Sequence, residues 1–131
     1  MAPFVAGATA AYGLIEDRNA VYADTQATSM IVENCWNSGV VVGPIKAVKP
    51  SDILGVKGWQ TLNGEAAGEG HAEDPYATLA WLANLLAERR RGMKAGMIVI
   101  TGSLIPTSSI SPGDRAVLTV DVLAQVVLDV V

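Results

Sequence analysis

The chain has 131 residues, half of them hydrophobic, so it is long enough for one domain with a modest core and too apolar for a disordered segment. Its net charge of −4 and pI near 4.8 argue against a nucleic-acid partner, which needs a basic surface. A single cysteine, Cys35, excludes an intrachain disulfide, and no basic leader or membrane-length apolar run is present, so we expect a cytoplasmic protein without a membrane partner.

The first third of the chain predicts two strands around a weak helix. Residues 4–16 are rich in small residues and suit a strand that approaches another backbone closely. Residues 25–38 weakly favour a helix, which Gly39 ends. Val40–Val42 then reads as a short buried strand.

A hairpin is the strongest short signal in the middle of the chain. Asn63-Gly64 separates two extended segments, residues 53–62 and 65–67. Both residues tolerate the positive φ angles of a two-residue turn that joins antiparallel strands. The sequence therefore predicts two paired strands here.

One helix is strongly predicted. Asp74 can cap its first turn, Pro75 suits its first position, and helical apolar spacing continues to about Arg91. Gly92 then ends it. We expect Trp81 to lie in the contact between this helix and a sheet.

The last third predicts three more strands: Met97–Thr101, residues 115–122 and residues 125–130. Many strands with one main helix indicate the α+β class. We expect a mixed β-sheet roll or barrel-like core, with the main helix (about 75–91) packed on it.

Six stretches of the sequence occur in an order typical of one family. The Ala-Trp-Leu-Ala-Asn helix, followed by a Thr-Gly-Ser-Leu strand, is the most specific pair among them. The six stretches are Asn63-Gly64-Glu65, Asp74-Pro75, Ala80–Ala87, Lys94–Gly96, Ile100–Leu104 and Pro112–Asp114. This series resembles the branch of the fumarylacetoacetate hydrolase superfamily that contains 2-hydroxypenta-2,4-dienoate hydratases and 4-oxalocrotonate decarboxylases. The resemblance covers only the C-terminal part of such a protein, and it implies a single truncated domain over residues 1–131.

The resemblance also bears on metal binding. Family members hold Mg²⁺ or Mn²⁺ with three carboxylates, two of them in a Glu-x-Glu pair that this sequence lacks. The segment Leu14–Arg18 resembles the family's Glu-Ile-Ile-Asp-Ser-Arg, which places the third ligand position on Gly13. A hard divalent cation needs several oxygen ligands, so we expect no metal and no cofactor. A shifted alignment would give the ligand role to Glu16 and restore Mg²⁺ or Mn²⁺.

Four residues are predicted to be catalytic. Glu16 and Asp17 are adjacent, so on a strand only one of them faces a given pocket. Glu33 matches a family Asp beside the active-site segment, and Ser103 lies where the family places substrate-contacting groups. The alternatives are solvated carboxylates, with Arg18 as a partner of the first pair, and a turn serine at position 103.

Five further residues are predicted to bind substrate. Tyr12, Trp36 and Trp59 are candidates for pocket walls, because aromatic side chains line most ligand sites. Arg18 and Asn37 lie close to them in the sequence and supply polar groups.

Two classes of function follow from these residues. The first is a metal-independent lyase or cyclase that uses hydrogen bonds and acid–base groups on a small enolisable or polyketide-type substrate, as in natural-product biosynthesis. The second is a non-catalytic structural or partner subunit of a hydratase- or decarboxylase-like complex. A metal-dependent 2-hydroxydienoate hydratase or decarboxylase is the third reading. Uncovered apolar surface predicts a homodimer or higher homo-oligomer.

Overall fold

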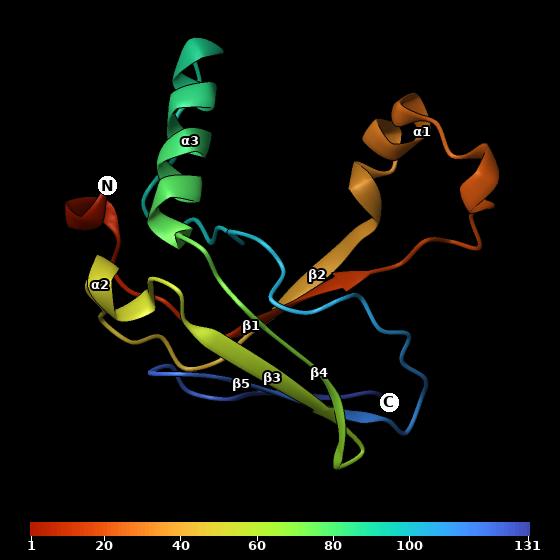
Figure 1. The fold of residues 1–131 in the computed structure, drawn as a ribbon. Coiled ribbons are helices and arrows are strands. Elements are labelled where there is room, and N and C mark those ends of the chain that lie inside the picture. The colour runs from red at the N-terminus through yellow and green to blue at the C-terminus, as the bar shows by residue number, and fades with distance from the viewer.

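Two antiparallel sheets form the centre of the molecule in a computed structural model that describes all of residues 1–131 (Figure 1). Strands β1 (Ala11–Ile15) and β2 (Asn37–Val42) pair as a two-stranded ribbon. The second sheet has the strand order β4-β3-β5-β6. Its strands are β3 (Lys57–Leu62), β4 (Glu65–His71), β5 (Arg115–Val120) and β6 (Val126–Asp129).

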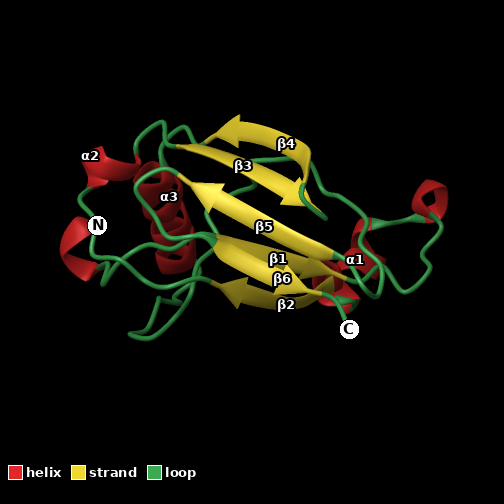
Figure 2. Cartoon of the chain, turned by 90° about the horizontal axis from the view of Figure 1, so that it is seen from below, coloured by secondary structure: helices red, strands yellow, loops and turns green.

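The α+β class is confirmed, but two details of the predicted sheet are wrong. Every strand pair is antiparallel, so the sheet is not mixed, and no closed barrel forms. A tight turn joins β3 to β4 and a short loop joins β5 to β6, and connections this short allow only antiparallel pairing, because parallel strands need a longer crossover. The β1–β2 ribbon lies against β6 of the four-stranded sheet, as the view from below shows (Figure 2).

The predicted hairpin is confirmed. Asn63 and Gly64 have φ angles of 53° and 86°, the positive values that the turn requires. The Asn63 side chain also fixes the hairpin to the next strand: its Nδ2 donates to Asp114 Oδ1 at 2.8 Å, and its Oδ1 accepts the backbone N–H of Arg115 at 2.8 Å.

The core lies between the ribbon and the four-stranded sheet, and it is thin. Ala10, Leu118, Val120 and Val126 form its buried cluster, with Tyr12 packed against it. Alternate residues of β5 are buried, as a strand with one covered face requires. Only eight of the 131 residues are buried, so much of the apolar surface faces outward.

The main helix, α3 (Pro75–Glu88), begins as predicted and ends three residues before Arg91. Asp74 Oδ1 accepts the N–H of Ala77 at 3.0 Å, which caps the first turn. The expected packing on the sheet is wrong: no residue of α3 is buried, Trp81 is 64% exposed, and the helix stands away from the strands (Figure 1). Ala83 of α3 instead lines a hollow together with the N-terminal turn and the loop after the helix.

The other helices are short. The predicted helix over 25–38 is α1 (Ala27–Val32), and α2 (Pro50–Ile53) precedes β3. Three 3₁₀ turns, at Ala2–Phe4, Tyr22–Asp24 and Asn34–Trp36, complete the helical content. No helix combines the length and the apolar character needed to cross a bilayer.

The strand predicted at Met97–Thr101 does not form. These residues belong to neither sheet, and from Ile98 to Ile110 no backbone N–H or carbonyl takes part in a backbone–backbone hydrogen bond. A strand needs a neighbour to complete its hydrogen-bond ladder, and none of the six strands lies beside this segment.

The chain crosses the β3–β4 hairpin immediately after this segment. A side chain on Gly70 would place its Cβ only 1.7 Å from the carbonyl oxygen of Leu104, and one on Gly58 would lie 2.7 Å from Leu104 Cδ1. Gly70 therefore permits a crossing that a side chain would block, whereas at Gly58 the obstacle is the end of the Leu104 side chain.

Candidate functional site: the arm between β1 and β2

The loop that joins β1 to β2, residues 16–36, forms an arm that projects from the sheets together with α1 (Figure 1). No residue of the arm is buried. Five of its non-glycine residues have positive φ angles between 51° and 60°; they are Arg18, Asn19, Asn34, Cys35 and Trp36. Each such residue costs of order 1 kcal/mol, so contacts within the arm must hold it in shape.

A chain of four side chains provides those contacts. The Tyr22 hydroxyl donates to Asp17 Oδ2 at 2.6 Å. The rings of Tyr22 and Trp36 meet edge to face, with centroids 5.5 Å apart and planes at 79°. Trp36 Nε1 donates to Glu33 Oε2 at 2.6 Å. We call Asp17, Tyr22, Trp36 and Glu33 the arm network, because it connects two carboxylates through two aromatic rings.

The electrostatics of Asp17 and Tyr22 follow from their hydrogen bond. The Tyr22 hydroxyl and, secondarily, the backbone N–H of Asn19 lower the pKa of Asp17 below its usual range. The same bond to an anion raises the pKa of Tyr22. At neutral pH, Asp17 is therefore an ionised carboxylate, and the Tyr22 hydroxyl beside it keeps its proton.

The base of the arm is fixed by the ribbon. The backbone N–H of Glu16 donates to the carbonyl of Trp36 at 3.0 Å, and Ile15 pairs with Asn37 after a shift in register. Glu16 and Asn37 are both exposed. The structure thus brings the predicted residues Glu16, Asp17, Trp36 and Asn37 into one region, with Glu33 bonded to Trp36.

Sequence reasoning missed Tyr22. It lies in a 3₁₀ turn five residues after Asp17, and neither helical nor strand periodicity relates the two positions. Only the reversal of the chain at Arg18 and Asn19, both at positive φ, returns its hydroxyl to Asp17.

Other predicted site residues lie in different parts of the fold. Ser103 Oγ donates to the carbonyl of Ile105 at 2.5 Å, as expected of a turn serine. Trp59 is on β3, where it pairs with Glu69 of β4. Arg18 is exposed and forms no ion pair; the one ion pair in the structure joins Arg115 to Asp129.

Tyr12 has a different environment from the arm. It lies on β1 against the core, and its buried hydroxyl has no hydrogen-bond partner. Burial raises the pKa of Tyr12 to about 12. The hydroxyl therefore keeps its proton at neutral pH and has a free donor to offer.

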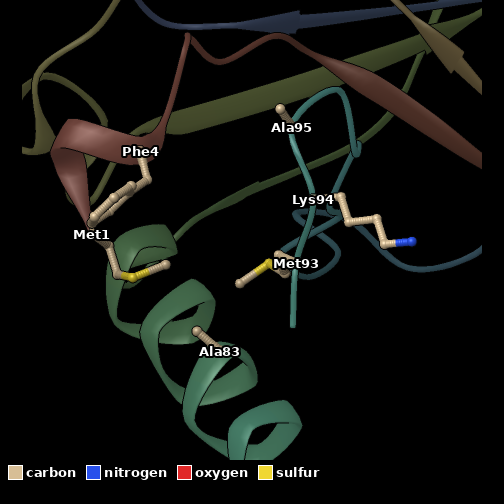
Figure 3. Close-up of a pocket in the computed structure, with 6 residues that line it drawn as sticks. All are labelled: Met1, Phe4, Ala83, Met93, Lys94 and Ala95. Atoms are coloured by element: carbon tan, nitrogen blue, oxygen red, sulfur yellow. The ribbon is translucent and has the colours of Figure 1, made fainter. Parts of the chain in front are cut away.

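Two hollows lie away from the arm network. One, of about 330 Å³, lies between the N-terminal turn, α3 and the following loop (Figure 3). Five of the six residues that line it are hydrophobic, and the side chain of Lys94 extends away from Met1 and Met93 in the view. The second, of about 310 Å³, lies on the β3–β4 hairpin and includes Trp59 and Glu69.

The residues present do not fit a divalent metal site. Nowhere does the structure gather three or more His, Cys, Asp or Glu residues that could hold a metal ion. Gly13 offers no ligand, and a Cβ there would meet Ile100 Cδ1 at 3.4 Å. Asp17 uses both carboxylate oxygens on Tyr22 and Asn19.

Comparison with known proteins identifies relatives of the chain. It is 29% identical over 118 residues to 2-keto-4-pentenoate hydratase 1 of Dechloromonas aromatica, and the matched region covers 86% of this chain and 43% of the relative. It is 37% identical over 92 residues to 4-oxalocrotonate decarboxylase of Pseudomonas putida, covering 66% of this chain and 35% of the relative. The chain is homologous to these enzymes of the fumarylacetoacetate hydrolase superfamily. It spans less than half the length of either one.

The fold agrees with this homology. A structure of 4-oxalocrotonate decarboxylase from Pseudomonas putida G7, complexed with magnesium and adipate, matches with a TM-score of 0.82 at 23% identity. A second structure of that enzyme, with calcium and acetate, gives 0.79 at 24%. Both matches cover 94% of this chain and 48% of the decarboxylase. No family model matches the sequence.

Proposed function

We propose that this chain is part of a lyase of hydratase or decarboxylase type, and that its arm carries acid–base groups for a small enolisable oxo acid. The homology supports the class of reaction. The observation that carries the assignment to the arm is the arm network, in which strained backbone and aromatic contacts hold two carboxylates in one exposed region.

The chemistry of enolisation suits these groups. A carboxylate can accept a proton from the carbon beside a carbonyl, and the electron pair of that C–H bond then forms an enolate. Glu33 has one oxygen, Oε2, bonded to Trp36, which leaves Oε1 for such a role. The guanidinium of Arg18, exposed and unpaired, can bind the carboxylate of an oxo acid.

A narrower form of the proposal is a metal-independent lyase or cyclase whose substrate is an enolisable or polyketide-type molecule. The donor set described above supports it, because it offers hydrogen bonds and carboxylates but no cluster for a divalent cation. In that form, positioning and hydrogen bonding replace Lewis-acid activation.

A second candidate function is that of a non-catalytic subunit in a hydratase- or decarboxylase-like complex. The thin core and the many exposed large apolar side chains favour it, since such surface is usually covered by another polypeptide.

Turnover of 2-keto-4-pentenoate and 4-oxalocrotonate, followed by ultraviolet absorbance with and without EDTA, tests the proposal. We expect turnover that survives EDTA and falls at least tenfold in Glu33→Gln. The matched control is Glu65→Gln, an exposed carboxylate on β4 outside the arm. Turnover abolished by EDTA would indicate a metal-dependent enzyme, and turnover unaffected by Glu33→Gln would remove the arm from the site.

A further inference from the structure

One asparagine of the chain is followed by a glycine: Asn63, at the tip of the β3–β4 hairpin. In such a pair the backbone nitrogen of the glycine can attack the side-chain amide carbon of the asparagine, because glycine has no Cβ to obstruct the approach. Both residues are exposed, and the amide of Gly64 makes no backbone–backbone hydrogen bond. Apart from the residues adjoining Gly64, no atom lies within 4 Å of the place that a Cβ would take there. The turn therefore places the two groups of a self-modification reaction side by side.

Three hydrogen bonds join Asn63 to the start of β5. Its backbone N–H donates to the carbonyl of Arg115 at 2.8 Å. Its side-chain Oδ1 accepts the backbone N–H of Arg115 at 2.8 Å, and its Nδ2 donates to Asp114 Oδ1 at 2.8 Å. These bonds continue the β3–β5 ladder beyond its last pair, Leu62 with Ala116. We call the two side-chain bonds the Asn63 latch.

The Asn63 latch opposes the attack. To react, the side-chain amide must turn one face of Cγ toward the nitrogen of Gly64, and this rotation breaks both bonds of the latch. Hydrogen bonds from Asn63 and, secondarily, from the backbone N–H of Ser111 lower the pKa of Asp114, so this acceptor is ionised at neutral pH. A hydrogen bond to a charged acceptor is stronger than one to a neutral acceptor. The reaction is therefore limited by how often the latch opens.

We propose that Asn63 is a site of spontaneous deamidation whose rate is set by the Asn63 latch. The backbone nitrogen of Gly64 loses its proton to the solvent and forms a bond to Asn63 Cγ. The bond between Cγ and Nδ2 then breaks, and Nδ2 takes a proton from water and leaves as ammonia. A second water opens the resulting cyclic imide, which leaves aspartate or isoaspartate at position 63. Water is the one co-reactant, and no group is oxidised or reduced.

The product of this reaction cannot restore the Asn63 latch. A carboxylate at position 63 has no N–H to donate, and it would meet the carboxylate of Asp114, from which it is repelled as a like charge. Isoaspartate also adds an atom to the backbone of a turn whose φ angles, 53° at Asn63 and 86° at Gly64, suit two residues of ordinary length. Deamidation therefore releases the tip of the hairpin from β5 irreversibly.

Peptide mass mapping during incubation of the chain at mildly alkaline pH tests the rate. We expect conversion at Asn63 before any other asparagine, and about tenfold slower in the folded chain than in urea, where the latch is absent. Asp114→Ala removes an acceptor of the latch and should accelerate conversion about fivefold. Asp114→Asn is the matched control: it too loses the charge and the contact with Ser111, but its amide oxygen can still accept from Asn63, so the rate should stay close to that of the native chain.

Amide exchange tests the consequence for the hairpin. Asn63→Asp reproduces one product and should raise exchange at the N–H groups of position 63 and Arg115 about fivefold. Asn84→Asp, which adds the same charge at an exposed position of α3, should leave both unchanged. The proposal would be overturned by equal conversion rates in Asp114→Ala and Asp114→Asn, by equal rates in the folded and unfolded chain, or by unchanged hairpin exchange in Asn63→Asp. None of these measurements depends on the proposed lyase activity.

Discussion

The four-stranded sheet and the arm are stabilised by different interactions. Of the six buried hydrophobic residues, four lie on β5 and β6: Ala116, Leu118, Val120 and Val126. The arm has no buried residue, and it is held by hydrogen bonds and one aromatic contact. Global stability therefore resides in the sheet, and local conformation in the arm is set by polar groups.

Because of this difference, the residues that set global stability and those of the candidate site lie in separate regions. Regions with few buried contacts open at lower free energy than the core, and strained backbone often accompanies a binding or catalytic role. Changes in the sheet should therefore unfold the molecule, whereas changes in the arm should alter the arm alone.

The largest effect is expected from Leu118→Ala. Leu118 is 5% exposed and lies on β5, between β3 and β6. Its truncation should lower the free energy of unfolding by about 2–4 kcal/mol, measured by urea denaturation with circular dichroism. Leu54→Ala, at a site 60% exposed, is the matched control and should change it by less than about 0.5 kcal/mol. Equal effects at both sites would contradict a core centred on β5.

A smaller and local effect is expected from Trp36→Phe. The substitution removes the N–H that donates to Glu33 while it retains an aromatic ring beside Tyr22. It should cost about 1 kcal/mol, seen as roughly fivefold faster amide exchange in residues 16–36 with the sheet unchanged. Trp81→Phe, exposed and without a hydrogen bond, is the matched control. Faster exchange in β5 would show that the two regions are coupled.

Tyr12→Phe should act in the opposite direction. It removes a buried hydroxyl that has no partner, so we expect a gain of up to about 1 kcal/mol in the free energy of unfolding. Burial disfavours the phenolate and raises the pKa of Tyr12 from 10.0 to about 12, so the native state loses stability relative to the unfolded chain as the pH rises from 10 to about 12. Tyr12→Phe should not show this part of the loss of stability at alkaline pH. A destabilised variant would mean that the hydroxyl has a partner.

The smallest effect concerns pH and the arm alone. The pKa of Asp17 is lowered, chiefly by Tyr22, so its contribution is present above its ordinary value of 3.8 and is lost as the pH falls below that value. We expect arm exchange to accelerate below pH 4 in the native chain but not in Asp17→Asn. Removing the charge should also lower the pKa of Tyr22, followed by tyrosinate absorbance.

Features set by neighbouring residues could be predicted from the sequence. Asp74 and Pro75 fix the start of α3, and Asn63-Gly64 fixes the hairpin, because each acts on its own turn of backbone. The homology to hydratases and decarboxylases was also readable from six ordered stretches.

Features that depend on distant partners could not be predicted. Met97–Thr101 has the composition of a strand but no strand beside it, and α3 has an apolar side without a sheet to cover. In the candidate site, Asp17 and Glu33 were readable as carboxylates, but their connection through Tyr22 depends on backbone reversals that no periodicity reveals.

The crossing of Leu104 over Gly58 and Gly70 has a consequence for sequence variation. A Cβ at Gly70 would overlap the Leu104 carbonyl oxygen, and backbone atoms cannot rotate aside as a side chain can. In a saturation library, position 70 should accept glycine alone. Position 58 should tolerate alanine once Leu104 is shortened, because there the obstacle is a movable methyl group. Among functional variants, we expect substitutions at positions 58 and 104 to occur together, while position 70 stays glycine.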